Sequence, residues 1–291
     1  MLVNYDCGGG ARLFVGARLF GRAFFGGAAG VIEALVTPSS ALREPWRLFF
    51  LAVLFVSIAV IMSVYVPSIA GGAVLLAMIP AIPLIWTLLV REEHREEDLG
   101  LLARDSFRYH APLFTVFTFF FLGATVAYAF WFAALPASQS QTVFGAQVDE
   151  IARIRGAVAP PTGSVINTDF AVSLFEHNLV VLAFMFAFCL LYGIGSIYLL
   201  LWNASIIGVF IGSRIAGGPA GAIAGFMGII PHGSLEIGAY FLATIAGGIL
   251  SAGIMRQHFG RREFRFILKD VALLTLAAVG MLAAGAILES L

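Results

Sequence analysis

Two short polar clusters interrupt long apolar stretches in the second half of the chain. The first is Glu176–Asn178 and the second is Pro231–Glu236. His232 and Glu236 are four residues apart, so on one helix their side chains project from the same face. Imidazole and carboxylate groups can transfer protons, bind a metal ion or hydrogen-bond between helices. Because ionisable groups are costly at membrane depth, these clusters are the first candidates for a functional site.

We treat six residues as one candidate polar cluster within the membrane: Glu176, His177, Asn178, Asn203, His232 and Glu236. In a first interpretation, they hydrogen-bond to one another and hold helices in register. In a second, they bind protons or a metal ion, with His177, His232 and Glu236 as the candidate ligands. In a third, they form a hydrolase site inside the membrane. Buried polar groups usually satisfy one another, which favours the first interpretation.

The hydrolase interpretation lacks the motifs that such chemistry needs. A metallohydrolase typically carries H-E-x-x-H, and nucleophilic catalysis needs a Ser or Cys beside an oriented base. Neither pattern occurs around the two clusters. We therefore assign no catalytic residue and no cofactor, and an enzymatic role is the less favoured expectation.

Composition places these residues in a membrane protein. Hydrophobic residues make up 60% of the 291 residues and charged residues 12%, whereas soluble domains carry about 25% charge. We therefore predict an all-α, polytopic transmembrane helical bundle in contact with the lipid bilayer. A formal net charge of zero argues against a nucleic-acid partner, since phosphate binding needs a basic surface. A homo-oligomer and contacts with other membrane or extracytoplasmic proteins are compatible with this composition.

The apolar stretches predict about seven spans, because one span needs about 20 apolar residues. Six stretches qualify: Leu48–Val66, Ile69–Val90, Leu113–Leu135, Leu179–Leu201, Leu235–Met255 and Val271–Leu288. Asn203–Ile230 is ambiguous, because Arg214 and Gly217-Gly218-Pro219 interrupt it. It is either one broken crossing or a re-entrant pair of half-helices.

The basic residues predict the orientation. With the N-terminus in the cytoplasm, fourteen of the seventeen Lys and Arg residues lie inside, as the positive-inside rule favours. We therefore predict a multi-pass protein of the cell membrane with both polar clusters at the outer ends of their helices. This orientation requires Asn203–Ile230 to cross the membrane once.

Four regions follow from this topology. Residues 1–47 form a cytoplasmic or interfacial amphipathic segment, and 48–135 form the first transmembrane helices. Residues 136–175 form an extracytoplasmic loop, with one short helix expected near Ala146–Arg155, and are the natural site for an external partner. Residues 176–291 form the C-terminal transmembrane core.

Glycines spaced by four residues predict close helix packing. The motifs are Gly208-x-x-x-Gly212 and Gly221-x-x-x-Gly225. Such small-residue faces let two helix backbones approach one another in lipid. The same glycines could instead form an unwound transport site, as broken helices do in carriers.

Three motifs resemble the stage II sporulation protein M family. They are His177-Asn178, Trp202-Asn203-x-x-x-x-Gly208-x-x-x-Gly212 and Pro231-His232-Gly233-x-x-Glu236, and the resemblance covers roughly 165–260. It implies a helical bundle in the membrane. The family's name-giving member acts with peptidoglycan-remodelling hydrolases as their membrane anchor. For this chain we expect a non-enzymatic scaffold or membrane-complex component, with a cation- or proton-coupled transporter as the alternative.

Overall fold

The computed structural model describes residues 37–99, 106–157, 168–192, 195–215, 218–255 and 262–290. Their regular elements are all helical: α2 (Pro38–Arg43), α3 (Trp46–Tyr65), the 3-10 helix η1 (Pro67–Gly72), α4 (Ala73–Leu99), α5 (Ser106–Ala134), α6 (Ala137–Ala157), α7 (Thr168–Tyr192), α8 (Ser196–Ile215), α9 (Gly218–Met255) and α10 (Arg262–Glu289). Within these residues, seven helical segments are long and apolar enough to cross a membrane. The predicted all-α polytopic fold is therefore confirmed.

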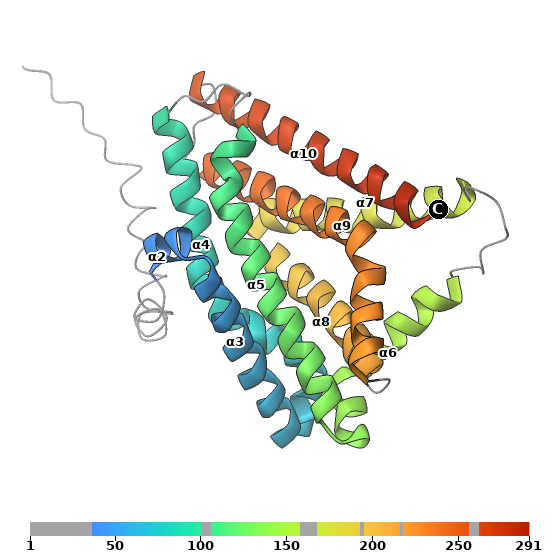
Figure 1. Ribbon diagram of the computed structural model, residues 1–291. Coiled ribbons are helices and arrows are strands. Elements are labelled where there is room, and N and C mark those ends of the chain that lie inside the picture. Colours follow the sequence, from blue (N-terminus) through green and yellow to red (C-terminus); the bar gives the residue numbers. More distant parts are fainter. Residues whose placement is uncertain are drawn as a thin grey trace, which may run out of the picture.

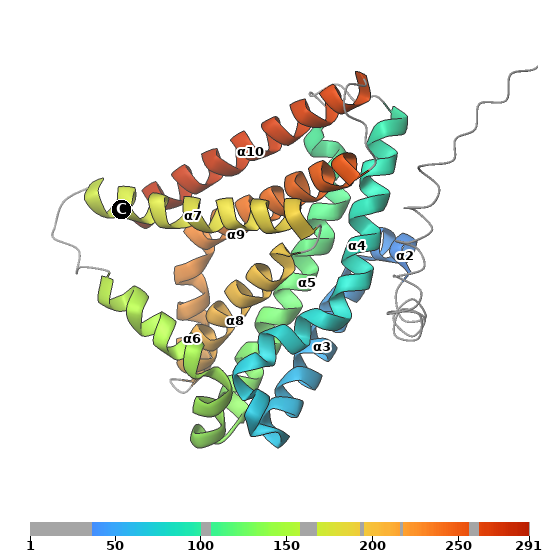
Figure 2. The ribbon, with the colours of Figure 1, turned by 180° about the vertical axis from the view of Figure 1, so that it is seen from behind.

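The helices form two groups that run in different directions. In both views α3, α4 and α5 run side by side, and α7, α10 and the C-terminal part of α9 form the other group (Figures 1 and 2). Every residue from Gly238 to Ile249 is buried, so α9 is the central helix of the bundle. A helix that is apolar on all sides is expected in such a position.

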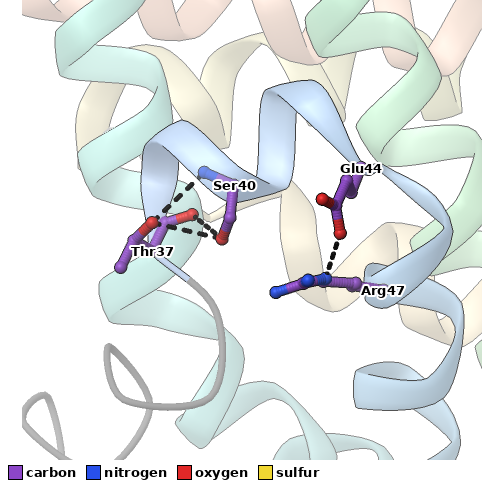
Figure 3. A network of polar contacts seen from close by, with 4 residues as sticks. All are labelled: Thr37, Ser40, Glu44 and Arg47. Atoms are coloured by element: carbon purple, nitrogen blue, oxygen red, sulfur yellow. Dashed lines mark hydrogen bonds and ion pairs between the residues drawn. The ribbon is translucent and has the colours of Figure 1, made fainter.

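The entry into the first span is fixed by local contacts, shown in Figure 3. The Thr37 hydroxyl accepts a hydrogen bond from the Ser40 amide at 3.2 Å, and Pro38 occupies the first turn of α2. Glu44 and Arg47 form an ion pair where α2 gives way to α3. Of the predicted amphipathic segment 1–47, residues 1–36 lie outside the described residues.

The predicted span Leu179–Leu201 is wrong. The chain forms two helices here, since α7 ends at Tyr192 and α8 begins at Ser196. Gly195 permits the close approach at this reversal, because a Cβ there would lie 2.7 Å from the Phe188 carbonyl oxygen. The glycines of the sequence Gly193-Ile194-Gly195 were the signal for a helix end.

The helix boundaries also divide Asn203–Ile230 between two helices. Its first part is the second half of α8, and its last part opens the long helix α9. Gly218, with φ of +80°, begins α9 in a backbone conformation that favours glycine. The number of candidate spans is seven within the described residues, and Gly218-Pro219 lie in the first turn of α9.

The polar clusters lie inside their helices, whereas we predicted them at helix starts. α7 begins at Thr168, so Glu176–Asn178 are more than two turns into it, and the predicted boundary at 175/176 falls within a helix. Pro231 lies inside the 38-residue α9, more than three turns after its start at Gly218. Both views show α9 bent in its first half (Figures 1 and 2), as a proline inside a helix explains.

The helix expected in the outer segment is longer than predicted. α6 covers Ala137–Ala157 and is not among the candidate spans. Val143, Phe144 and Gln147 face the bundle and are buried. Gln147 Nε2 donates to Ser205 Oγ of α8 at 3.2 Å, which fixes α6 against a membrane-spanning helix.

Candidate functional site

One asparagine joins α7 to α9. Asn178 is only 7% exposed, and its Nδ2 donates to Glu236 Oε1 at 2.5 Å. The Tyr240 hydroxyl donates to Asn178 Oδ1 at 3.1 Å. Glu236 and Tyr240 are one helical turn apart, so both reach the same point on α7. Both ends of the Asn178 amide are therefore bonded to α9.

A third helix, α10, completes the site. Glu289, the last residue of α10, places Oε2 4.0 Å from His232 Nε2, which is an ion-pair distance when the imidazole is protonated. Gly285 lets α10 approach closely, since a Cβ there would lie 3.4 Å from the His232 carbonyl oxygen and 3.5 Å from Glu236 Cγ. Asn178, His232, Glu236, Tyr240 and Glu289 thus form a three-helix polar cluster.

The structure corrects the membership of the predicted cluster. It brings Asn178, His232 and Glu236 together, but Glu176 and His177 are exposed on α7. Asn203 lies on α8 and donates to the Leu199 carbonyl oxygen of its own helix at 2.8 Å. Sequence spacing placed His232 and Glu236 on one face correctly. It could not give the rotation of α7, which turns Asn178 inward and its two neighbours outward.

His177 is exposed on α7 and lies near Glu150 of α6. The hydrogen bond from Arg153 holds the pKa of the Glu150 carboxyl below its usual value, and the nearby His177 lowers this pKa further. The three candidate metal ligands His177, His232 and Glu236 therefore do not converge. In the described part of the chain, no three His, Cys, Asp or Glu side chains are placed to hold a metal ion.

Sequence reasoning missed four polar residues. Tyr240 and Glu289 belong to the three-helix cluster described above. His110 of α5 and Asp270 of α10 form a second buried pair, with Nε2 and Oδ2 2.8 Å apart and exposures of 1% and 7%. His110 and Asp270 each lie just before a predicted span, as the two predicted clusters do. A search for ionisable residues next to apolar stretches would therefore have found them.

The two polar sites lie near opposite ends of α10. Asp270 and Glu289 are 19 residues apart, which is about 28 Å along a helix and close to the thickness of a bilayer core. Under the predicted orientation, the His110–Asp270 pair lies toward the cytoplasm and the three-helix cluster toward the outside.

The spaced glycines lie where helices touch. A Cβ on Gly208 would come within 2.6 Å of Tyr128 Cβ on α5, and one on Gly212 within 2.7 Å of the Ala129 carbonyl oxygen. Gly221 and Gly225 make the corresponding approach to the end of α8: a Cβ on Gly221 would lie 2.6 Å from the Arg214 carbonyl oxygen. All four occur in regular helix, as packing motifs do and unwound transport segments do not.

Comparison with protein-family models gives a match to stage II sporulation protein M over residues 116–291. The chain belongs to this family. The matched region runs from α5 to the end of the chain and contains the whole three-helix cluster, so it is longer than the 165–260 covered by the motifs. No curated protein and no solved structure matches the chain.

Proposed function

We propose that this family member is a non-enzymatic scaffold that holds partner proteins at the membrane. The observation that carries the proposal is the double hydrogen bonding of Asn178, which links α7 to α9 through both ends of one amide. An amide bonded at both ends to another helix serves to fix the two helices, since its donor and its acceptor are occupied. A substrate site would need such groups available to the substrate.

The surface best suited to a partner is the exposed face of α6. Phe144 packs against Tyr128 and Phe132 of α5, and Gln147 bonds to α8, so the helix is held rigidly. Its other side presents polar groups such as Gln141 and Asp149. A rigid polar helix beside the membrane can bind a soluble protein without an ordering cost. The family resemblance suggests peptidoglycan-remodelling hydrolases as the partner class.

A photocrosslinking residue in place of Asp149 tests this surface. We expect a discrete protein adduct from membranes that contain the native partners. The matched control is the same substitution at Leu276, which is 71% exposed on α10 and faces away from the bundle. That position should give lipid adducts only. A failure of the Asp149 position to give more protein adduct than Leu276 would sink the scaffold proposal for α6.

A transporter is the second candidate, because part of the cluster is accessible. The His232 and Glu289 side chains are 22% and 26% exposed, and with Glu236 they bring two carboxylates and an imidazole together. Such a set could bind a proton or a cation.

Reconstitution into proteoliposomes separates the two candidates. For a scaffold, we expect no proton or cation flux above that of protein-free vesicles, and we expect His232→Ala to lower the melting temperature and the yield of assembled complex together. A flux that His232→Ala abolishes, while the melting temperature stays unchanged, would establish the transporter instead.

A further inference from the structure

A cavity of about 320 Å³ lies between α5 and α10, beside the His110–Asp270 pair. Its walls are Phe107, His110, Ala111, Phe114 and Thr115 of α5, Leu242 of α9, and Ala277 and Met281 of α10. This volume is at the lower end of the range for ligand sites, about 300–1,000 Å³. The cavity lies outside the three-helix cluster and has no part in the scaffold proposal.

The side chains that line the cavity favour an apolar ligand. Apart from His110 and Thr115, the lining residues carry no polar side chain, and the Thr115 hydroxyl already donates to the Ala111 carbonyl oxygen at 2.8 Å. The cavity begins at the first turns of the span Phe107–Ala134. Phe107, which is 45% exposed, and Ala111, which is also exposed, form its outer wall. In a membrane-spanning helix such a surface meets hydrocarbon chains.

The ends of the same two helices carry positive charge. Arg108 follows Phe107 directly and Lys269 precedes Asp270, and both side chains are exposed. Basic residues at the membrane surface attract anionic lipid headgroups, each by about 1 kcal/mol or a factor of about five in affinity. Arg108 and Lys269 lie two residues and one residue from the bonded pair His110–Asp270, so exposed cations on both helices accompany the apolar cavity. This combination suits an anionic phospholipid.

We propose that the groove between α5 and α10 binds one acyl chain of an anionic phospholipid, whose phosphate contacts Arg108 and Lys269. The buried hydrogen bond between His110 and Asp270 joins the two walls and so fixes the width of the groove. α5 packs mainly against α3 and α8, and α10 mainly against α9 and α7, so this bond is a principal link between the walls.

Native mass spectrometry of the full chain in detergent, with added phosphatidylglycerol or phosphatidylcholine of identical chains, tests the proposal. We expect phosphatidylglycerol to bind more tightly. Arg108→Gln with Lys269→Gln should weaken its binding about twenty-five-fold, since each charge contributes a factor of about five. Both positions are on the surface, so this double variant leaves the core intact. Arg214→Gln, an exposed cation at the end of α8, is the matched control and should leave binding unchanged.

A second pair of variants tests the cavity itself. Ala111→Leu with Ala277→Leu fills the groove and should abolish the bound lipid, whereas Ala133→Leu at the exposed far end of α5 should not. Free glycerol phosphate should fail to displace the lipid, because it has no chain. The proposal is overturned by equal binding of both lipids, by lipid retention in the filled variant, or by displacement with glycerol phosphate.

Discussion

Replacing Asn178 by alanine is the sharpest test of the three-helix cluster. The change removes the two hydrogen bonds that join α7 to α9 and leaves the Glu236 carboxyl and the Tyr240 hydroxyl without this partner. Hydrogen bonds between membrane helices contribute on average about 0.6 kcal/mol each and at most about 1.7 kcal/mol. Two such bonds give an expected loss of about 1 to 3.5 kcal/mol in the free energy of unfolding.

The assay is reversible unfolding in mixed micelles with increasing SDS, followed by tryptophan fluorescence. A double-mutant cycle of Asn178→Ala and Tyr240→Phe should give a coupling of about 0.6–1.7 kcal/mol, because the two residues share a bond. Asn203→Ala is the matched control, since Asn203 is also an amide within a span but, among the described residues, its side chain bonds to its own helix. An Asn203→Ala loss as large as that of Asn178→Ala, or a coupling near zero, would refute the reasoning.

Three further predictions concern other parts of the bundle. Asp270→Ala should lower the free energy of unfolding by about 1–3 kcal/mol, because it removes the carboxylate that bonds the buried His110 imidazole, as SDS titration can measure. Gly208→Ala should cost about 1–3 kcal/mol in the same assay, since its Cβ would overlap α5. Arg153→Gln should raise the pKa of Glu150 toward its usual value of about 4.3, as an NMR titration of the carboxyl carbon can follow.

Each of these has its own control or contradicting result. Replacing both His110 and Asp270 by leucine should recover most of the stability lost in Asp270→Ala, because neither polar partner of this hydrogen bond then remains in the core. Gly228→Ala, the control for Gly208→Ala, should be neutral or stabilising, since nothing lies within 4 Å of its Cβ position.

The pKa of Glu150 is lower in the folded than in the unfolded protein, so its pair with Arg153 stabilises the fold while the carboxyl is ionised. This stabilisation is complete above the unfolded-state pKa of Glu150 and is lost as the pH falls through its folded-state pKa. A Glu150 pKa that does not move in Arg153→Gln contradicts that pairing.

The fold was predictable because lipid imposes a strong rule. Backbone groups cannot remain unsatisfied in hydrocarbon, so apolar stretches of sufficient length must be helices. Composition therefore predicted the all-α bundle and the number of spans. The helix ends were harder to predict. Leu179–Leu201 is largely apolar and is interrupted only by the small residues Gly193, Gly195 and Ser196, so its mean hydropathy does not reveal that the chain forms two helices here.

The candidate site was predictable only in part. The cost of ionisable groups in lipid pointed to Asn178, His232 and Glu236, and the i,i+4 spacing placed the last two on one face. Partners from elsewhere in the chain, such as Tyr240 and Glu289, depend on which helices are neighbours. The spacing of residues along one helix does not indicate which other helices pack against it.

The sequence by itself determined that this chain is a seven-span helical membrane protein of the stage II sporulation protein M family, because composition and motif spacing are properties of single segments. Only the tertiary structure decided which polar residues meet. The rotation of α7 separated Asn178 from His177, and the packing of α10 brought Glu289 to His232 and Asp270 to His110. The rotation of each helix about its axis, and which helices pack together, depend on the packing of entire helix faces. Each residue contributes only a small part of that packing energy.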